Sequence, residues 1–209
     1  MPGRRRAVTA ALAAGCGAVC IAAGVVGLTH ARPSVDSAPI GPVPMPVART
    51  AVVPAPIVVA AAPVGLSMPD RHVTAPVVPV EVDADGAVGV PDPPTTVGWW
   101  SSGARPGDPS GTVVIVGHID SRTAGVGTLA VLPALESGEP IEVRGADGHT
   151  IRYRVVARRQ FHKADLPGEV FAQEGPARLV LITCGGPFDR KRRSYEDNVV
   201  GYALPDWLG

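Results

Sequence analysis

Residues 179–184 read Leu-Val-Leu-Ile-Thr-Cys, an apolar run that ends in a cysteine and is followed by Gly-Gly-Pro at 185–187. A short run of branched aliphatic residues bounded by glycine and proline is typical of a buried strand that gives way to a loop. Of the chain's three cysteines, Cys16 and Cys20 lie in an apolar N-terminal stretch, which leaves Cys184 without a partner in the remaining chain. In an exported protein, such a single thiol indicates an intermolecular partner or a reactive nucleophile.

The N-terminus predicts export. Three arginines at 4–6 precede an uncharged stretch from Ala7 to Leu28, which as a helix of about 1.5 Å per residue is long enough to cross a bilayer core of about 30 Å. The basic flank would remain in the cytoplasm. We therefore expect a single-pass membrane anchor over residues 1–30, with the rest of the chain extracellular. A cleaved signal peptide, or lipid modification of Cys16, would also place the rest of the chain outside.

Residues 31–64 predict a disordered linker. Fourteen of the 23 prolines fall between Pro33 and Pro94, and all nine aromatic residues lie at or beyond Trp99. Frequent proline without aromatic residues favours an extended, polyproline-like chain over a packed core. Fully extended at about 3.1 Å per residue, this linker would reach on the order of 100 Å, enough to hold a domain away from a membrane. A linker that provides only slack fits the same composition.

Residues 65–209 predict one all-β domain. Strand-like segments are short and frequent between residues 73 and 203, and Ala146-Asp147-Gly148 is typical of a hairpin turn. Helical signals are limited to 127–135 and 167–173. We expect a closed or nearly closed β-barrel with short helical insertions. Trp99 and Trp100, adjacent at a turn, are expected to pack in the core with one ring partly exposed.

Charge and metal-ligand patterns exclude several function classes. The formal net charge is zero, so the chain has no general attraction to nucleic acid. The histidines are scattered and no Cys-x-x-Cys pair occurs, which predicts no metal or cofactor. Arg190–Arg193 form a basic run six to nine residues after Cys184. This run is either a solvated loop or a source of positive charge that lowers the pKa of the thiol.

His118 is the histidine best placed to exchange protons with Cys184. It follows the expected strand 112–116 through Gly117 and precedes Asp120, which could fix the loop. A nucleophilic thiol needs such a partner at hydrogen-bonding reach. Taken alone, a histidine of this kind is more often structural. Because His118 and Cys184 both follow buried strands, the pair favours a catalytic role.

These residues resemble the sortase family. Thr183-Cys184 matches the end of the sortase cysteine signature, and Gly117-His118 matches its histidine motif. The resemblance to actinobacterial class F sortases is more specific and is carried by Gly98-Trp99-Trp100, Pro106-Gly107, Val116–Ser121, Thr183–Asp189, Tyr195 and Asp197–Val200. It covers about residues 65–209.

The resemblance implies an eight-stranded sortase barrel and a cysteine transpeptidase. Such enzymes cleave a sorting signal of the Leu-Pro-x-Thr-Gly kind on secreted surface proteins. They join the new carboxyl end to an amine of the cell wall or of a protein lysine. Cys184 would form an acyl-enzyme thioester, and His118 would act as general acid and then as base. Thr183 and Asp120 would support these two residues.

The family's arginine has no direct match, because Asp197 and Asn198 occupy the equivalent positions. Arg190 is the first candidate for the oxyanion donor, with Arg193 and Arg178 as alternatives. Two other functions stay open from the residues: a thiol hydrolase of the same fold, and a non-catalytic surface-tethered domain with Cys184 as a buried structural thiol.

Overall fold

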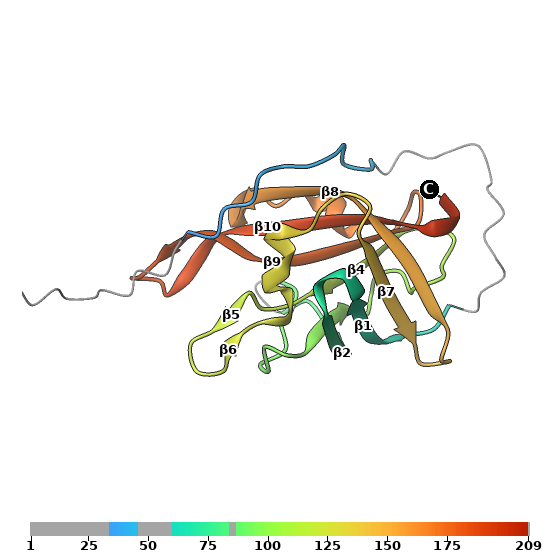
Figure 1. Ribbon diagram of the computed structural model, residues 1–209, viewed down its shortest axis with the longest axis horizontal. Coiled ribbons are helices and arrows are strands. Elements are labelled where there is room, and N and C mark those ends of the chain that lie inside the picture. Colours follow the sequence, from blue (N-terminus) through green and yellow to red (C-terminus); the bar gives the residue numbers. More distant parts are fainter. Residues whose placement is uncertain (1–33, 46–59, 84–86, 209) are drawn as a thin grey trace, which may run out of the picture. The chain divides into compact units, whose positions relative to one another are not determined.

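Short strands rich in valine and isoleucine close into a barrel (Figure 1). The computed structural model describes residues 34–45, 60–83 and 87–208. The barrel strands are β1 (Pro63–Met68), β2 (Val73–Val80), β3 (Val97–Trp100), β4 (Thr112–Val116), β7 (Pro140–Gly145), β8 (Thr150–His162), β9 (Arg178–Asp189) and β10 (Ser194–Pro205). Their order around the barrel is β1-β2-β3-β4-β9-β10-β8-β7. The predicted closed, eight-stranded all-β barrel is therefore confirmed.

Among the residues that the structure describes, helical structure is limited to short 3-10 segments, as the sequence predicts. They are η1 (Pro69–Arg71), η2 (Thr128–Ala134), η3 (Lys163–Asp165), η4 (Gly168–Phe171) and η5 (Asp206–Leu208). A two-stranded ribbon, β5 (Asp120–Ser121) with β6 (Gly125–Val126), follows β4. The expected turn at 146–148 joins β7 and β8 as a hairpin.

Strand β9 is buried on both faces, because its side chains belong alternately to two different apolar clusters. Leu179 and Leu181 face the barrel interior, whose core takes side chains from all eight strands. Val180 and Ile182 face an outer cluster, which η4 covers with Val170. A strand buried on both faces needs a continuous apolar sequence, which explains the run at 179–182. The same alternation directs Cys184 to the outer face.

Trp99 and Trp100 lie on β3 and are both buried, at 4% and 9% exposure. Core packing is confirmed, but the expectation of a turn and of one partly exposed ring is wrong. The difference arises because β3, like β9, is covered on both faces: Trp99 joins the interior core and Trp100 the outer cluster, edge-on to Phe171.

Residues 34–45, here called the strap, lie extended against the barrel (Figure 1, blue). Val35 forms an antiparallel bridge with Gly186 of β9, and Ile40 forms one with Arg158 of β8. The Ser37 N–H donates to Gln160 Oε1 at 2.7 Å. The strap falls within the expected linker, and β1 begins at Pro63, two residues before the expected domain start. These contacts were not predicted from the sequence.

The expected membrane segment, residues 1–30, lies outside the described residues. Within the part of the chain that the structure describes, no helix is long and apolar enough to cross a membrane.

Candidate active site

Cys184 lies in a groove on the outer face of the barrel. The thiol is half-buried and belongs to the described part of the chain, in which it forms no disulfide. The groove has a volume of about 510 Å³. Its apolar wall consists of Val88, Val90, Val116, Leu166, Phe171 and Ile182. An apolar groove whose lining includes a thiol is suited to binding a peptide with apolar side chains.

The register of β4 and β9 directs the segments of His118 and Cys184 to the same end of the barrel. The two strands pair in parallel, with Val116 opposite Ile182. The Gly117 N–H donates to the Ile182 carbonyl at 3.1 Å, so the hydrogen bonding continues one residue beyond β4. His118 and Cys184 each follow the last residue pair of this ladder by two positions, so both leave the same end of the parallel pair. Cys184 is on the outer face, which it shares with Ile182 by the alternation of the strand.

The imidazole of His118 is oriented by the loop between β2 and β3. Its Nε2 lies 2.9 Å from the carbonyl oxygen of Pro91. A carbonyl oxygen only accepts, so Nε2 carries the hydrogen and donates it. In the neutral ring, Nδ1 is then the acceptor and can take a proton. Gly127 passes so close that a Cβ there would lie 2.1 Å from the His118 carbonyl oxygen, which requires glycine at this position.

Thr183 and Asp120 attach the histidine segment to the cysteine segment. The buried Thr183 hydroxyl donates to the Gly117 carbonyl at 2.9 Å, so it links β9 to the residue before His118. The Tyr195 hydroxyl donates to Asp120 Oδ2 at 3.0 Å, so it links the loop after His118 to β10. Both residues were expected to support the site. Their contacts suit a positioning role, since they tie the residues on either side of His118 to β9 and β10.

The arginines named from the sequence lie away from Cys184. Arg190 and Arg193 are in the exposed turn of the β9–β10 hairpin, whose strands still pair at Asp189 and Ser194. At about 3.3 Å per residue, Arg190 is roughly 15–20 Å along the chain from Cys184. Arg178 lies a similar distance away at the opposite end of β9. Burial lowers the pKa of the Arg178 guanidinium, which donates to Thr112, Pro44 and Glu169.

Two polar residues of the groove were not assigned a role from the sequence. Asn198 of β10 pairs directly with Cys184 and lines the groove. Lys163 also lines the groove, and its Nζ donates to the Ser194 hydroxyl at 2.8 Å. From the sequence, Asn198 stands out only because it occupies a position equivalent to that of the family's arginine. The pairing of β8, β9 and β10, which single strand patterns do not encode, brings them to the site.

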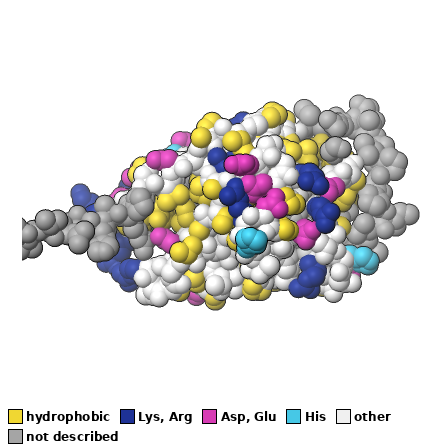
Figure 2. Space-filling view, in the orientation of Figure 1, with side chains coloured by type: hydrophobic (Ala, Val, Ile, Leu, Met, Phe, Trp, Pro, Cys, Tyr) yellow, Lys and Arg dark blue, Asp and Glu magenta, His cyan; other side chains and the backbone are white. Residues whose placement is uncertain are grey.

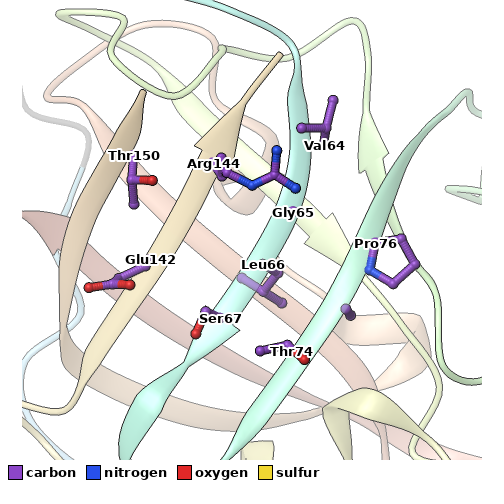
Figure 3. A pocket seen from close by; sticks show the side chains of 10 residues that line it. Val64, Gly65, Leu66, Ser67, Thr74, Pro76, Glu142, Arg144 and Thr150 are labelled. Carbon is purple, nitrogen blue, oxygen red and sulfur yellow. The ribbon is translucent and has the colours of Figure 1, made fainter. Parts of the chain in front are cut away.

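A second cavity, of about 490 Å³, lies across β1, β2, β7 and β8 (Figure 3). The guanidinium of Arg144 extends over Gly65 there, where a Cβ would approach Nη2 to 3.1 Å. Its lining includes no cysteine or histidine. Among the described residues, no group of three His, Cys, Asp or Glu side chains is arranged to hold a metal ion. The Cys184 groove is therefore the candidate site for nucleophilic chemistry.

Comparisons with known proteins give the family of the domain and support its fold. The family model of the sortase domain matches residues 66–206. The fold is similar to a lid mutant of sortase A from Corynebacterium diphtheriae, with 18% identity, 71% of this chain and 72% of that chain covered, and a TM-score of 0.54. Sortase C-1 from Actinomyces oris matches with 20% identity, 68% and 72% coverage and a TM-score of 0.53. No curated protein sequence matches the chain.

Proposed function

This chain belongs to the sortase family, and we propose that it is a transpeptidase of the class F type that uses Cys184 as its nucleophile. The substrate is a sorting signal of the Leu-Pro-x-Thr-Gly kind on secreted surface proteins. The acceptor is an amine of the cell wall or of a protein lysine. The observation that carries the proposal is the register of β4 and β9, which supports His118 and Cys184 acting on the same peptide bond.

The proposed reaction has two acyl transfers. The Cys184 thiolate attacks the threonine carbonyl carbon of the signal, and the carbon–nitrogen bond to glycine breaks. His118 gives its proton to the departing amine, and a thioester on Cys184 remains. The acceptor amine then attacks the thioester carbonyl and loses a proton to His118. The carbon–sulfur bond breaks, and the thiolate of Cys184 is restored.

Each attack produces an oxyanion that needs a fixed donor. Asn198 supports this role better than the hairpin arginines, because it is the cross-strand neighbour of Cys184 and lines the groove. A side-chain amide is among the groups that serve as oxyanion donors. We assign the oxyanion contact to Asn198 together with backbone N–H groups beside Cys184. The apolar wall of the groove suits the leucine and proline of the signal.

We also propose that residues 1–30 anchor the protein in the cell membrane in a single pass, with the barrel outside the cell. The uncharged stretch between Ala7 and Leu28, preceded by arginines, supports this location.

The test is to trap the acyl-enzyme. The full chain is incubated with a library of Leu-Pro-x-Thr-Gly peptides and an amine, and its mass is measured after rapid acid quenching. We expect one acyl adduct, located on Cys184, and transfer of the acyl group to the amine. Cys184→Ala should give neither adduct nor product, with the unfolding midpoint of the parent. If Cys184→Ala still joined peptide and amine, the proposal would be wrong.

Two further measurements distinguish the transpeptidase from a thiol hydrolase and from a domain with a structural thiol. Without the amine, a transpeptidase releases peptide slowly, whereas rapid release to water would identify a thiol hydrolase. Prompt labelling of Cys184 in the native protein by a thiol reagent is expected, because the thiol is half-buried at a groove. Labelling only on unfolding, together with no adduct, would indicate a structural thiol.

A further inference from the structure

The turn of the β9–β10 hairpin presents four consecutive cations to solvent. Arg190, Lys191, Arg192 and Arg193, here called the basic tip, are all exposed. The carboxylate nearest in sequence, Asp189, accepts the backbone N–H groups of Lys191 at 2.7 Å and Arg192 at 3.1 Å. Its ion pair with Arg192 is long, at 3.7 Å, and the Arg192 side chain is exposed. Asp189 therefore shapes the turn and leaves the basic tip with a net positive charge.

The hairpin below the basic tip is held in place. Its strands stay paired to Ser194 and Asp189, and the rings of Phe188 and Tyr195 meet edge-to-face at 5.1 Å. Tyr195 is also bonded to Asp120. Figure 1 shows the hairpin projecting from the barrel, and Figure 2 shows Lys and Arg side chains at the same end of the molecule. The four charges are thus presented outward on a fixed support.

The strap brings the N-terminal part of the chain to the base of this hairpin. Val35 donates to the Gly186 carbonyl at 3.2 Å, and Gly186 donates to the Val35 carbonyl at 2.8 Å. Gly186 is only two residues beyond Cys184. The described chain therefore begins beside the active-site end of the barrel. An anchor preceding it would be connected there, and not through the full length of the expected linker.

Chain length then limits the distance to a membrane. Val35 lies only seven residues further along the chain than Leu28, the end of the uncharged stretch, with six residues between them. Seven residues span at most about 25 Å, compared with the order of 100 Å expected for a free linker. From Gly186 to Arg190 the hairpin adds roughly 13 Å. The basic tip is therefore within reach of the headgroup layer in which the anchor would end.

We propose that the basic tip binds the anionic headgroups of the membrane that anchors this chain, and so holds the Cys184 groove close to the membrane surface. Of the proposed function, this proposal requires the membrane anchor at residues 1–30 but not the transpeptidase reaction. Each lysine or arginine near an anionic surface adds to the electrostatic attraction, which salt weakens. The contact orients the groove towards substrates that are themselves still at the membrane.

The experiment uses protection from trypsin, which cleaves after lysine and arginine. The full chain is reconstituted in vesicles of phosphatidylcholine alone or with about one-third phosphatidylglycerol. Cleavage at residues 190–193 is timed by mass spectrometry, relative to cleavage at the exposed Arg152. We expect phosphatidylglycerol to slow cleavage at the basic tip at least fivefold, and about 0.5 M salt to remove the protection.

Charge variants test the assignment. Lys191→Gln with Arg192→Gln keeps two cleavage sites and should lose most of the protection. Arg154→Gln with Arg159→Gln, which removes two charges from β8, should retain it. Equal cleavage in both kinds of vesicle would overturn the proposal, as would protection by a soluble polyphosphate but not by phosphatidylglycerol, which would indicate a polymer partner. Peptide transfer measured in detergent should be unaffected by the Lys191 and Arg192 changes, so failure of the catalytic proposal is seen separately.

Discussion

The two ends of the parallel pair β4–β9 differ in how their polar groups are satisfied. At the first end, the buried Arg178 donates to Thr112 Oγ1 at 2.9 Å, to the Pro44 carbonyl at 2.7 Å and to the Glu169 carbonyl. At the other end, Cys184 and His118 are half-buried. There Nε2 of His118 donates to the Pro91 carbonyl at 2.9 Å, and the Thr183 hydroxyl donates to the Gly117 carbonyl at 2.9 Å. We call these the closed end and the open end.

The two ends of this strand pair therefore have different roles: the closed end contributes to the stability of the fold, and the open end is available to bind a substrate. Both ends belong to one ladder, so they share backbone geometry. At the closed end a charge is surrounded by acceptors from the strap and from η4, and it holds those segments on the barrel. At the open end Cys184 and Asn198 line a groove, where they can form bonds with a substrate. Substitutions at the two ends should therefore separate stability from activity.

The largest effect is expected at the open end, from His118→Ala. The variant loses its proton donor and acceptor, so kcat should fall about 10²–10⁴-fold, measured as peptide transfer to an amine at neutral pH. Its unfolding midpoint should stay close to that of the parent. His149→Ala is the matched control, since His149 lies exposed in the β7–β8 turn and should leave kcat unchanged. Equal losses in both variants would remove His118 from the mechanism.

The next effect is expected at the closed end. Arg178→Met leaves three acceptors without their charged donor, which should lower the free energy of unfolding by about 2–4 kcal/mol. Urea unfolding measures it, and the kcat of the remaining folded protein should match the parent. Arg154→Met is the control, because the ion pair of Arg154 with Asp206 is exposed and should contribute below about 1 kcal/mol. A selective loss of kcat in Arg178→Met would contradict the division between the ends.

The open end was more predictable from the sequence than the closed end. Cys184, His118 and their supports Thr183 and Asp120 follow recognisable strand ends, and the alternation of β9 gives the face of the thiol. The partners of Arg178 come from the strap and η4, far away in sequence. A proline-rich segment has no alternation of apolar and polar residues that would indicate a face for packing against the barrel. The sequence therefore predicts a disordered linker where the strap lies. The positions of Asn198 and Lys163 at the groove depend on which strands pair with each other, and the sequence of a single strand does not specify its neighbours.

A smaller effect is expected between the two ends, from Thr183→Val. The change keeps the shape of the side chain but removes its bond to the Gly117 carbonyl. Because both atoms are buried, the free energy of unfolding should fall by about 1–2 kcal/mol. Since Gly117 precedes His118, kcat should also fall modestly, while Thr183→Ser should retain both properties. Unchanged kcat with lowered stability would show that this bond does not position His118.

The smallest effect at neutral pH is expected from Tyr202→Phe, in the outer cluster near the closed end. Burial raises the pKa of Tyr202 to about 12, although the Arg178 charge lowers it in part. Its hydroxyl has no hydrogen-bond partner among the described residues. Removing it should therefore change the free energy of unfolding by less than about 1 kcal/mol at neutral pH.

The pH dependence makes Tyr202 a probe of the closed end. A raised pKa means that the folded state favours the neutral phenol, so its contribution is complete below about pH 10, the ordinary tyrosine value, and is lost as the pH rises towards 12. Between about pH 8 and about pH 11, the free energy of unfolding measured with urea should fall less in Tyr202→Phe than in the parent. The free energy of unfolding of Tyr202→Phe should still fall to some extent at high pH, because burial also raises the pKa of Tyr153. In Arg178→Met, Tyr202 should ionise at still higher pH, since the nearby cation is gone. Identical pH dependence in parent and Tyr202→Phe would mean that the closed end opens before Tyr202 ionises.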